Sequence, residues 1–210
     1  MNNQLTEIIC VVDRSGSMAS IQNDAIGGFN TFLDEQQKLP GEARLTLVLF
    51  DHEYDCILDA VPVQHVQPLT SQTYVPRGST ALFDAVGRTI DSVGARLAAT
   101  PEADRPGQVL VCILTDGLEN ASLTYSRDRV RAMVEHQQEQ YNWQFHYIAA
   151  NQDAFAEGAG IGIRRENVMP YVADSVGMRN AFSYLARRSA DIRRWSTSNQ
   201  KNPTTSSPNS

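Results

Sequence analysis

The chain has 210 residues, of which 41% are hydrophobic and 20% charged, and its 18 basic and 24 acidic residues give a formal net charge of -6. This length suits one domain with one hydrophobic core, and the composition excludes a chain that is disordered, collagenous or coiled-coil throughout. The acidic balance disfavours general binding to nucleic acids or anionic membranes, because no overall positive field gathers phosphate groups.

The apolar runs and the cysteines indicate in which cellular compartment the protein is expected. The longest apolar runs, at residues 8–12 and 109–114, are too short to cross a bilayer, and the first residues lack the basic and apolar segments of a signal peptide. The three cysteines, Cys10, Cys56 and Cys112, form no CxxC pair. We expect a reduced, cytoplasmic protein, with a disulfide between Cys10 and Cys112 as the alternative.

Apolar, β-branched runs alternate with segments of helical periodicity, which predicts an α/β fold with a single doubly wound open sheet, mostly parallel, and helices on both faces. The expected strands cover residues 7–12, 44–50, 56–63, 109–115 and 144–150, and the expected helices cover residues 20–37, 81–99, 126–141 and 175–195. The short connection at 51–55 permits only an antiparallel hairpin, which we place at one edge of the sheet. The most apolar strand, 109–115, is expected at the centre. Residues 151–173 leave room for a short helix and a short sixth strand.

The end of the chain differs in composition. Residues 196–210 contain no aliphatic or aromatic side chain, so they cannot bury enough surface to repay ordering. We therefore expect a domain over residues 1–195 and a disordered tail over residues 196–210.

Oxygen-bearing side chains stand beside several predicted elements. Asp13, Ser15 and Ser17 leave the first strand, Thr80 precedes the second helix, and Asp116 ends the fourth strand. Loops at the carboxyl ends of parallel strands converge where the strand order reverses, so we expect these side chains to meet. A donor set without sulfur or imidazole favours a hard cation, Mg²⁺, with Mn²⁺ or Ca²⁺ as alternatives, over zinc.

Helix capping offers other roles for some polar residues. In a second interpretation of the first loop, Ser17 or Ser20 caps the following helix. Asn151 or Asp153 is expected to cap a short helix, with a place on the rim of the metal site as the alternative.

Aromatic and basic residues outside these loops are expected to have structural roles. Trp143 and Trp195 are expected to pack in the core or between helices, and an exposed Trp195 is the alternative as an anchor for a partner. Basic residues near the end of the last helix are expected to complement its dipole. These are Arg187, Arg188, Arg193 and Arg194. The histidines fall at no metal-ligand spacing, and we expect them at the surface or half-buried. They are His52, His65, His136 and His146.

The sequence resembles the von Willebrand factor type A (VWA) domains, whose metal-ion-dependent adhesion site (MIDAS) has the form Asp-x-Ser-x-Ser with a distant Thr and a more distant Asp. The resemblance covers roughly residues 6–194, and all of the motif's positions are present in order. They are Asp13, Ser15, Ser17, Thr80 and Asp116. The resemblance implies that Ser15, Ser17 and Thr80 are hydroxyl ligands, and that Asp13 and Asp116 accept hydrogen bonds from metal-bound waters and from the serines. It also implies the strand order 3-2-1-4-5-6 with an antiparallel edge.

The chain is most similar to the stand-alone intracellular members of this family, because no signal peptide, membrane span or terminal disulfide pair is expected. These members imply an adaptor or subunit role in multiprotein assemblies, often beside AAA+ ATPases. We therefore expect a protein-binding module and not an enzyme, in which a bound Mg²⁺ captures an Asp or Glu of a protein partner. The alternative is a metal-dependent hydrolase acting on a phosphoester or a similar substrate, although no catalytic base or nucleophile arrangement accompanies the motif.

Overall fold

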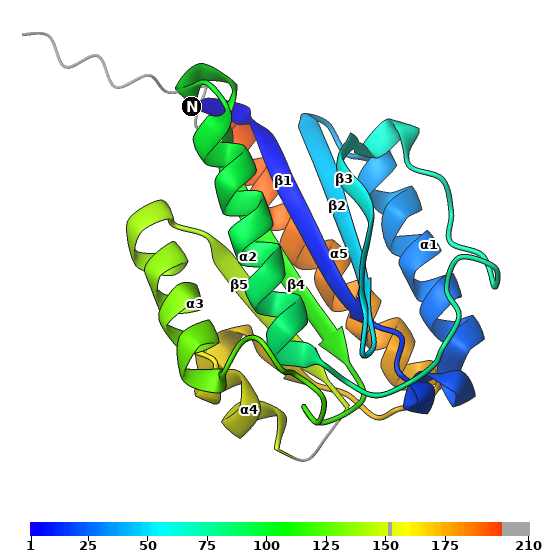
Figure 1. Ribbon diagram of the computed structural model, residues 1–210. Coiled ribbons are helices and arrows are strands. Elements are labelled where there is room, and N and C mark those ends of the chain that lie inside the picture. The colour runs from blue at the N-terminus through cyan, green and yellow to red at the C-terminus, as the bar shows by residue number, and fades with distance from the viewer. Residues whose placement is uncertain (151–152, 199–210) are drawn as a thin grey trace, which may run out of the picture.

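A mixed sheet forms the middle layer of the fold. The computed structural model describes residues 1–150 and 153–198, with side chains as far as Arg194. Across these residues the sheet has six strands in the order β3-β2-β1-β4-β5-β6 (Figure 1). In chain order they are β1 (Asn2–Asp13), β2 (Glu42–Phe50), β3 (Tyr54–Pro62), β4 (Pro106–Thr115), β5 (Gln144–Ala149) and β6 (Val168–Pro170). Only β2 and β3 pair in antiparallel fashion among these strands. The predicted fold class, edge hairpin and central position of β4 are confirmed.

Helices cover both faces of the sheet. They are α1 (Gln22–Lys38), α2 (Leu82–Ala99), α3 (Arg127–Tyr141), α4 (Ala154–Gly160) and α5 (Ser175–Ser198), with 3-10 turns η1 (Gly16–Ile21), η2 (Val63–His65), η3 (Glu102–Asp104) and η4 (Arg165–Asn167). Helices α1 and α5 pack together behind the sheet as Figure 1 shows it, whereas α2 and α3 lie in front. The predicted helices are confirmed, except that the first turn expected in α1 is the separate turn η1. The short helix and the sixth strand left open within residues 151–173 are α4 and β6.

The central strand β1 shows why the sheet needs helices on both faces. Ile8, Cys10 and Val12 join the core under α1 and α5, whereas Ile9 and Val11 join the core under α2 and α3. Successive side chains of a strand point to opposite faces, so an unbroken apolar run must be covered twice. This double burial holds β1 and β4 rigidly at the centre, and their carboxyl ends carry the candidate site.

The buried cysteines lie side by side in the sheet. Cys10 on β1 is the register partner of Cys112 on β4. Both are buried, and both are free thiols. The alternative of a disulfide between them is therefore wrong, and the two residues pack as small apolar side chains.

Two predictions on single residues are corrected. His146 on β5 is only 2% exposed, not half-buried, and its Nδ1 lies 2.8 Å from the hydroxyl oxygen of Tyr184 on α5. Arg193 does not complement the dipole of its own helix, because its buried guanidinium donates to backbone carbonyls at the end of α1. Trp143 is buried and stacks on Phe145, as predicted.

The end of the chain is described only in part. Helix α5 extends to Ser198, beyond its predicted end at residue 195, and residues 199–210 lie outside the described residues. The side chain of Trp195 also lies outside them. The division into a domain and a tail therefore stays a prediction. No helix within the described ranges is long and apolar enough to cross a lipid bilayer.

Candidate metal centre

Asp13 is the last residue of β1, and the chain holds both oxygens of its carboxylate. The backbone N–H of Ser15 donates to Oδ1 at 2.6 Å, and the hydroxyl of Thr115, the last residue of β4, donates to Oδ2 at 2.6 Å. Burial raises the pKa of Asp13 to about 6, against the lowering effect of the hydrogen bonds from Thr115 and Ser15. The carboxylate is thus fixed between β1 and β4, where the strand order reverses.

A chain of oxygen atoms runs from the loop after β1 to the loop after β4. Ser15 Oγ lies 3.1 Å from Ser17 Oγ, and the Ser17 hydroxyl donates to Asp116 Oδ1 at 2.6 Å. Burial raises the pKa of Asp116, and the hydrogen bond from Ser17 opposes the rise. Ser15 is buried, whereas Ser17 is exposed. The chain of oxygens therefore begins at the buried Ser15, passes the exposed Ser17 and ends at the half-buried Asp116.

Thr80 comes from a third loop and faces the same place. Its backbone N–H donates to Asn120 Oδ1 at 2.9 Å, and its carbonyl accepts from the Asn120 N–H at 3.0 Å. A Cβ atom added to Gly117 would lie 3.1 Å from Thr80 Oγ1 and 3.8 Å from Ser17 Oγ. The two hydroxyls therefore border one small space beside Gly117, which a side chain at that position would begin to fill.

The loop at residues 117–125, which follows Asp116, is braced by two carboxylates. Glu119 accepts the backbone N–H groups of residues 121 and 122 at 2.9 and 2.7 Å and one N–H from the first turn of α2 at 2.9 Å. Asp84, in that first turn, accepts the N–H groups of residues 123–125 at 2.7 to 2.9 Å. These bonds tie the loop to the start of α2, the helix that Thr80 precedes.

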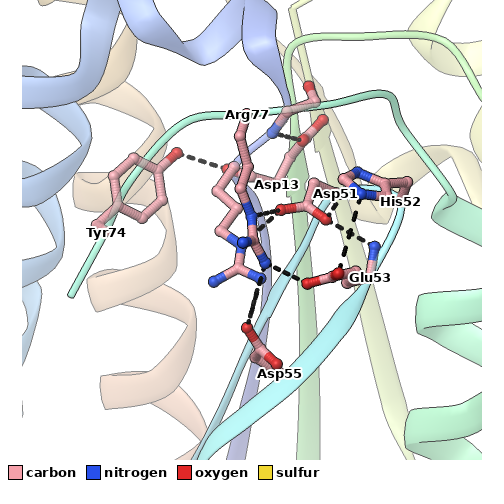
Figure 2. A network of polar contacts seen from close by, with 9 residues as sticks. Asp13, Asp51, His52, Glu53, Asp55, Tyr74 and Arg77 are labelled. Atoms are coloured by element: carbon pink, nitrogen blue, oxygen red, sulfur yellow. Dashed lines mark hydrogen bonds and ion pairs between the residues drawn. The ribbon is translucent and has the colours of Figure 1, made fainter.

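A network of ion pairs lies on the other side of the site, at the turn between β2 and β3 (Figure 2). Asp51 Oδ2 accepts from Arg14 Nε at 2.9 Å and from Arg77 Nε at 2.8 Å. Arg14 also pairs with Asp55 at 2.5 Å, and Arg77 pairs with Glu53. Burial opposes ionisation of Asp51, but the hydrogen bonds from Arg77, from the Glu53 N–H and from Arg14 hold its pKa below the ordinary value.

Backbone hydrogen bonds reinforce this network. The Arg77 N–H donates to the Arg14 carbonyl at 2.8 Å, and the Gly16 N–H donates to the Gly78 carbonyl at 3.1 Å. Gly78 has a φ of +65°, and a Cβ there would lie 2.0 Å from Nδ1 of His52, so the position requires glycine. The segment that leads to Thr80 is therefore bound to the loop after β1.

The donor atoms fit a hard cation. Neighbouring ligands on Mg²⁺, at about 2.0–2.1 Å and right angles, lie about 2.9 Å apart. The 3.1 Å separation of Ser15 Oγ and Ser17 Oγ suits two such positions. Within the described part of the chain no three His, Cys, Asp or Glu side chains gather as a metal site, so a cation here would depend on hydroxyl ligands. The structure brings the five predicted site residues together, and their binding of a metal stays a prediction.

The interpretation of Ser17 or Ser20 as a cap of α1 is wrong, and the capping of α4 is tested only at Asp153. The Ser17 hydroxyl bonds to Asp116, the Ser20 hydroxyl bonds to the Ser17 carbonyl, and neither caps α1. Asp153 precedes α4, but its side chain makes no capping hydrogen bond. Asn151 lies outside the described residues.

Several residues that shape the site were not predicted from the sequence. The strand-end rule that selected Asp13 applies equally to Asp51, which directly follows β2 at the same edge of the sheet. Arg14, Arg77 and Asn120 carry no such pattern, because their partners are distant in the chain and only the folded topology brings them together.

Comparisons with known proteins address the fold. No protein-family model matches the chain, and no curated protein matches it. Proximal thread matrix protein 1 from the mussel byssus, in a structure with a zinc-occupied MIDAS motif, matches 89% of this chain and 48% of its own, with 13% identity and a TM-score of 0.62. The von Willebrand factor domain of the type V pili tip protein Mfa5 from Porphyromonas gingivalis matches 87% of this chain and 94% of its own, with 12% identity and a TM-score of 0.60. The ArnB paralog VWA2 from Sulfolobus acidocaldarius matches 84% of this chain and 43% of its own, with 15% identity and a TM-score of 0.55.

These similarities identify the fold. The mixed sheet, its antiparallel edge and its two helical layers are those of a VWA domain, and the Mfa5 domain is covered almost entirely. At such low identities the similarity shows the fold alone. The chain spans about half the length of the mussel protein, since it covers 48% of it.

Proposed function

We propose that this chain is a Mg²⁺-dependent protein-binding module that captures a carboxylate of its partner. One observation carries the proposal: hydroxyls and carboxylates from three separate loops converge on one point at the carboxyl end of the central strands. Direct ligands would be the hydroxyls of Ser15, Ser17 and Thr80. The zinc-occupied MIDAS motif of the mussel protein supports a metal at the corresponding place in this fold.

The carboxylates suit an indirect role. Both oxygens of Asp13 already accept hydrogen bonds from the chain, and Asp116 accepts from the Ser17 hydroxyl. Asp13 thereby orients the Ser15 backbone, and Asp116 orients the Ser17 oxygen. When bound, Mg²⁺ would supply an electrophilic centre with an exchangeable position for an oxygen ligand, since three hydroxyls fill only part of about six coordination positions.

The partner follows from this chemistry. A hard cation with neutral protein ligands favours a carboxylate oxygen in its open position, so we propose that a protein partner supplies an Asp or Glu. By analogy with intracellular VWA proteins, an assembly that contains an AAA+ ATPase in the cytoplasm is the proposed setting.

Metal binding is tested first. A ligand that binds only the native state raises the free energy of unfolding by about 2.7 kcal/mol at 100 times its Kd, so Mg²⁺ or Mn²⁺ should raise the Tm of the chain and EDTA should reverse the rise. Asp116→Ala removes the acceptor of the Ser17 hydroxyl and should abolish this increase. Equal increases for the wild type and Asp116→Ala would contradict the proposed site.

Partner capture is tested second. An affinity pull-down should recover a protein that is lost with EDTA and with Asp13→Ala, and whose binding requires one of its own acidic residues. Binding that survives both changes would place recognition on another face. Hydrolysis of a phosphoester panel with Mg²⁺ or Mn²⁺, abolished by Asp13→Ala, would instead favour the hydrolase.

A further inference from the structure

Asp51 contacts both segments that carry the hydroxyl ligands. Its side chain binds Arg14, which lies between Asp13 and Ser15, through Nε at 2.9 Å. The same carboxylate oxygen, Oδ2, also accepts from Arg77 Nε at 2.8 Å, and Arg77 belongs to the segment that precedes Thr80. Its backbone carbonyl accepts the N–H of the residue after Thr80 at 2.8 Å. One residue at the end of β2 therefore connects the loop after β1 with the segment before α2.

The carboxylate of Asp51 is held in one orientation. It is fully buried, and its second oxygen, Oδ1, accepts the Glu53 N–H at 2.6 Å. The side chain of Arg14 is only 8% exposed, so water does not replace this pairing easily. Hydrogen bonds between charged groups in such a setting are stronger and more directional than exposed ones.

We infer that Asp51 is a positioning residue for the metal centre, which sets the spacing between the serine hydroxyls and the Thr80 hydroxyl. This inference rests on the proposed function, because it concerns the same cation. Residues that orient metal ligands without touching the metal commonly change metal affinity by about 10–100-fold when they are replaced. Asp51 contacts two ligand-bearing segments, the loop after β1 and the segment before α2.

The charge of Arg14 gives a second reason for a positioning role of Asp51. Arg14 is adjacent in sequence to Asp13, and Asp51 is its buried counter-ion. With Asp51 replaced, the Arg14 guanidinium would keep only its bond to the half-exposed Asp55 and would compete with a cation for the carboxylates of the site, since both are positive groups that prefer carboxylate oxygens. Asp51 therefore keeps the Arg14 charge engaged outside the space bordered by the three hydroxyls.

The test uses Mn²⁺ as the probe, with Kd measured by electron paramagnetic resonance or calorimetry well below the Tm of every variant. Asp51→Asn retains the shape but has one acceptor oxygen where the carboxylate has two, and should raise Kd about 10–100-fold. Asp51→Glu restores the charge and should recover part of the affinity. Arg77→Gln, at a half-exposed position, should loosen the segment that leads to Thr80 and raise Kd to a smaller extent. This variant replaces Asp51→Asn in the test if Asp51→Asn does not fold.

Two controls separate positioning from stability. Asp59→Asn makes the same substitution on β3, where the exposed Asp59 pairs with the half-buried Arg96, and should leave Kd within about twofold, which is less than 1 kcal/mol. Arg193→Ala destabilises the fold far from the site and should also leave Kd unchanged. Wild-type binding with an unchanged Kd in Asp51→Asn, or in Arg77→Gln if Asp51→Asn does not fold, would overturn the inference, as would an equal loss in Arg193→Ala. Absence of Mn²⁺ binding in the wild type would instead refute the proposed function, and the inference with it.

Discussion

Arg193 on α5 donates hydrogen bonds to the C-terminal end of α1. We therefore expect its removal to lower the free energy of unfolding. Its Nη1 donates to the carbonyl of Gln36 at 2.6 Å. Its Nη2 donates to the carbonyls of Leu39, Pro40 and Gly41 at 3.0, 3.3 and 2.9 Å. The last carbonyls of a helix have no partner within the helix, so this guanidinium supplies donors for the end of α1 and the turn after it. Arg193 is 2% exposed, and burial lowers its pKa.

The size of the loss follows from these bonds. A hydrogen bond to a charged group contributes roughly 1.5–3 kcal/mol, and bonds that converge on one side chain are not additive. Because Arg193→Ala removes the bond to Gln36 and the bonds to residues 39–41 together, the total loss in the free energy of unfolding should be about 3–5 kcal/mol. In a domain of this size that corresponds to a fall in Tm of roughly 6–20 °C.

Urea and thermal unfolding measure this directly. Arg187→Ala is the matched control, because Arg187 is an exposed arginine on the same helix and should change the free energy of unfolding by no more than about 0.5 kcal/mol. Arg193→Lys keeps the charge but not the fork of donors, and should fall between the two. A loss below about 1 kcal/mol in Arg193→Ala would show that water satisfies these carbonyls and would refute the reasoning.

Two further predictions concern pH and backbone conformation. Burial, aided by the charge of Arg188, lowers the pKa of His146 to about 4, so the unfolded chain binds the proton more readily and stability is complete only above about pH 6.5. The free energy of unfolding of the wild type should therefore fall by about 2–3 kcal/mol relative to His146→Gln as the pH drops from about 6.5 to 4, and parallel pH curves for the two proteins would contradict this. Gly78→Ala should lower stability by at least about 1 kcal/mol and weaken Mn²⁺ binding, because of the positive φ and the contact with His52. A variant with wild-type Tm and Kd would show that the loop relaxes without cost.

Much of this fold could be predicted because its buried strands and amphipathic helices are long. The run at residues 109–115 and the stripe on α2 leave few alternatives, and the predicted bounds of α2 differ from the observed ones by a single residue at the start. The segment at 151–173 was harder to predict, since α4 has 7 residues and β6 has 3, and elements this short show no clear hydrophobic period.

The site residues also divide into those that the sequence could predict and those that it could not. Asp13 ends one apolar strand and Asp116 follows another, so their meeting could be inferred from topology before any coordinates. The pairing of Arg14 with Asp51 and the capping of α1 by Arg193 could not, because each depends on side-chain directions that no local pattern encodes. His146 was misjudged for a related reason: alternation places it on a buried face of β5, but only α5 supplies the Tyr184 hydroxyl that makes its burial tolerable.

Burial of the acidic residues gives the site its chemical character. The raised pKa of Asp13, about 6, lies below neutral pH, so the carboxylate is charged there despite its desolvation. That charge costs free energy, which the hydrogen bonds from Thr115 and Ser15 offset only in part. Asp116 has a raised pKa for the same reason. Desolvated carboxyl groups beside hydroxyls held at cation-ligand spacing would be stabilised by a divalent cation. Under the proposed function, the interior that holds β1 and β4 in place would also favour the bound cation, so the packing of these strands would contribute to the capture of a partner's carboxylate.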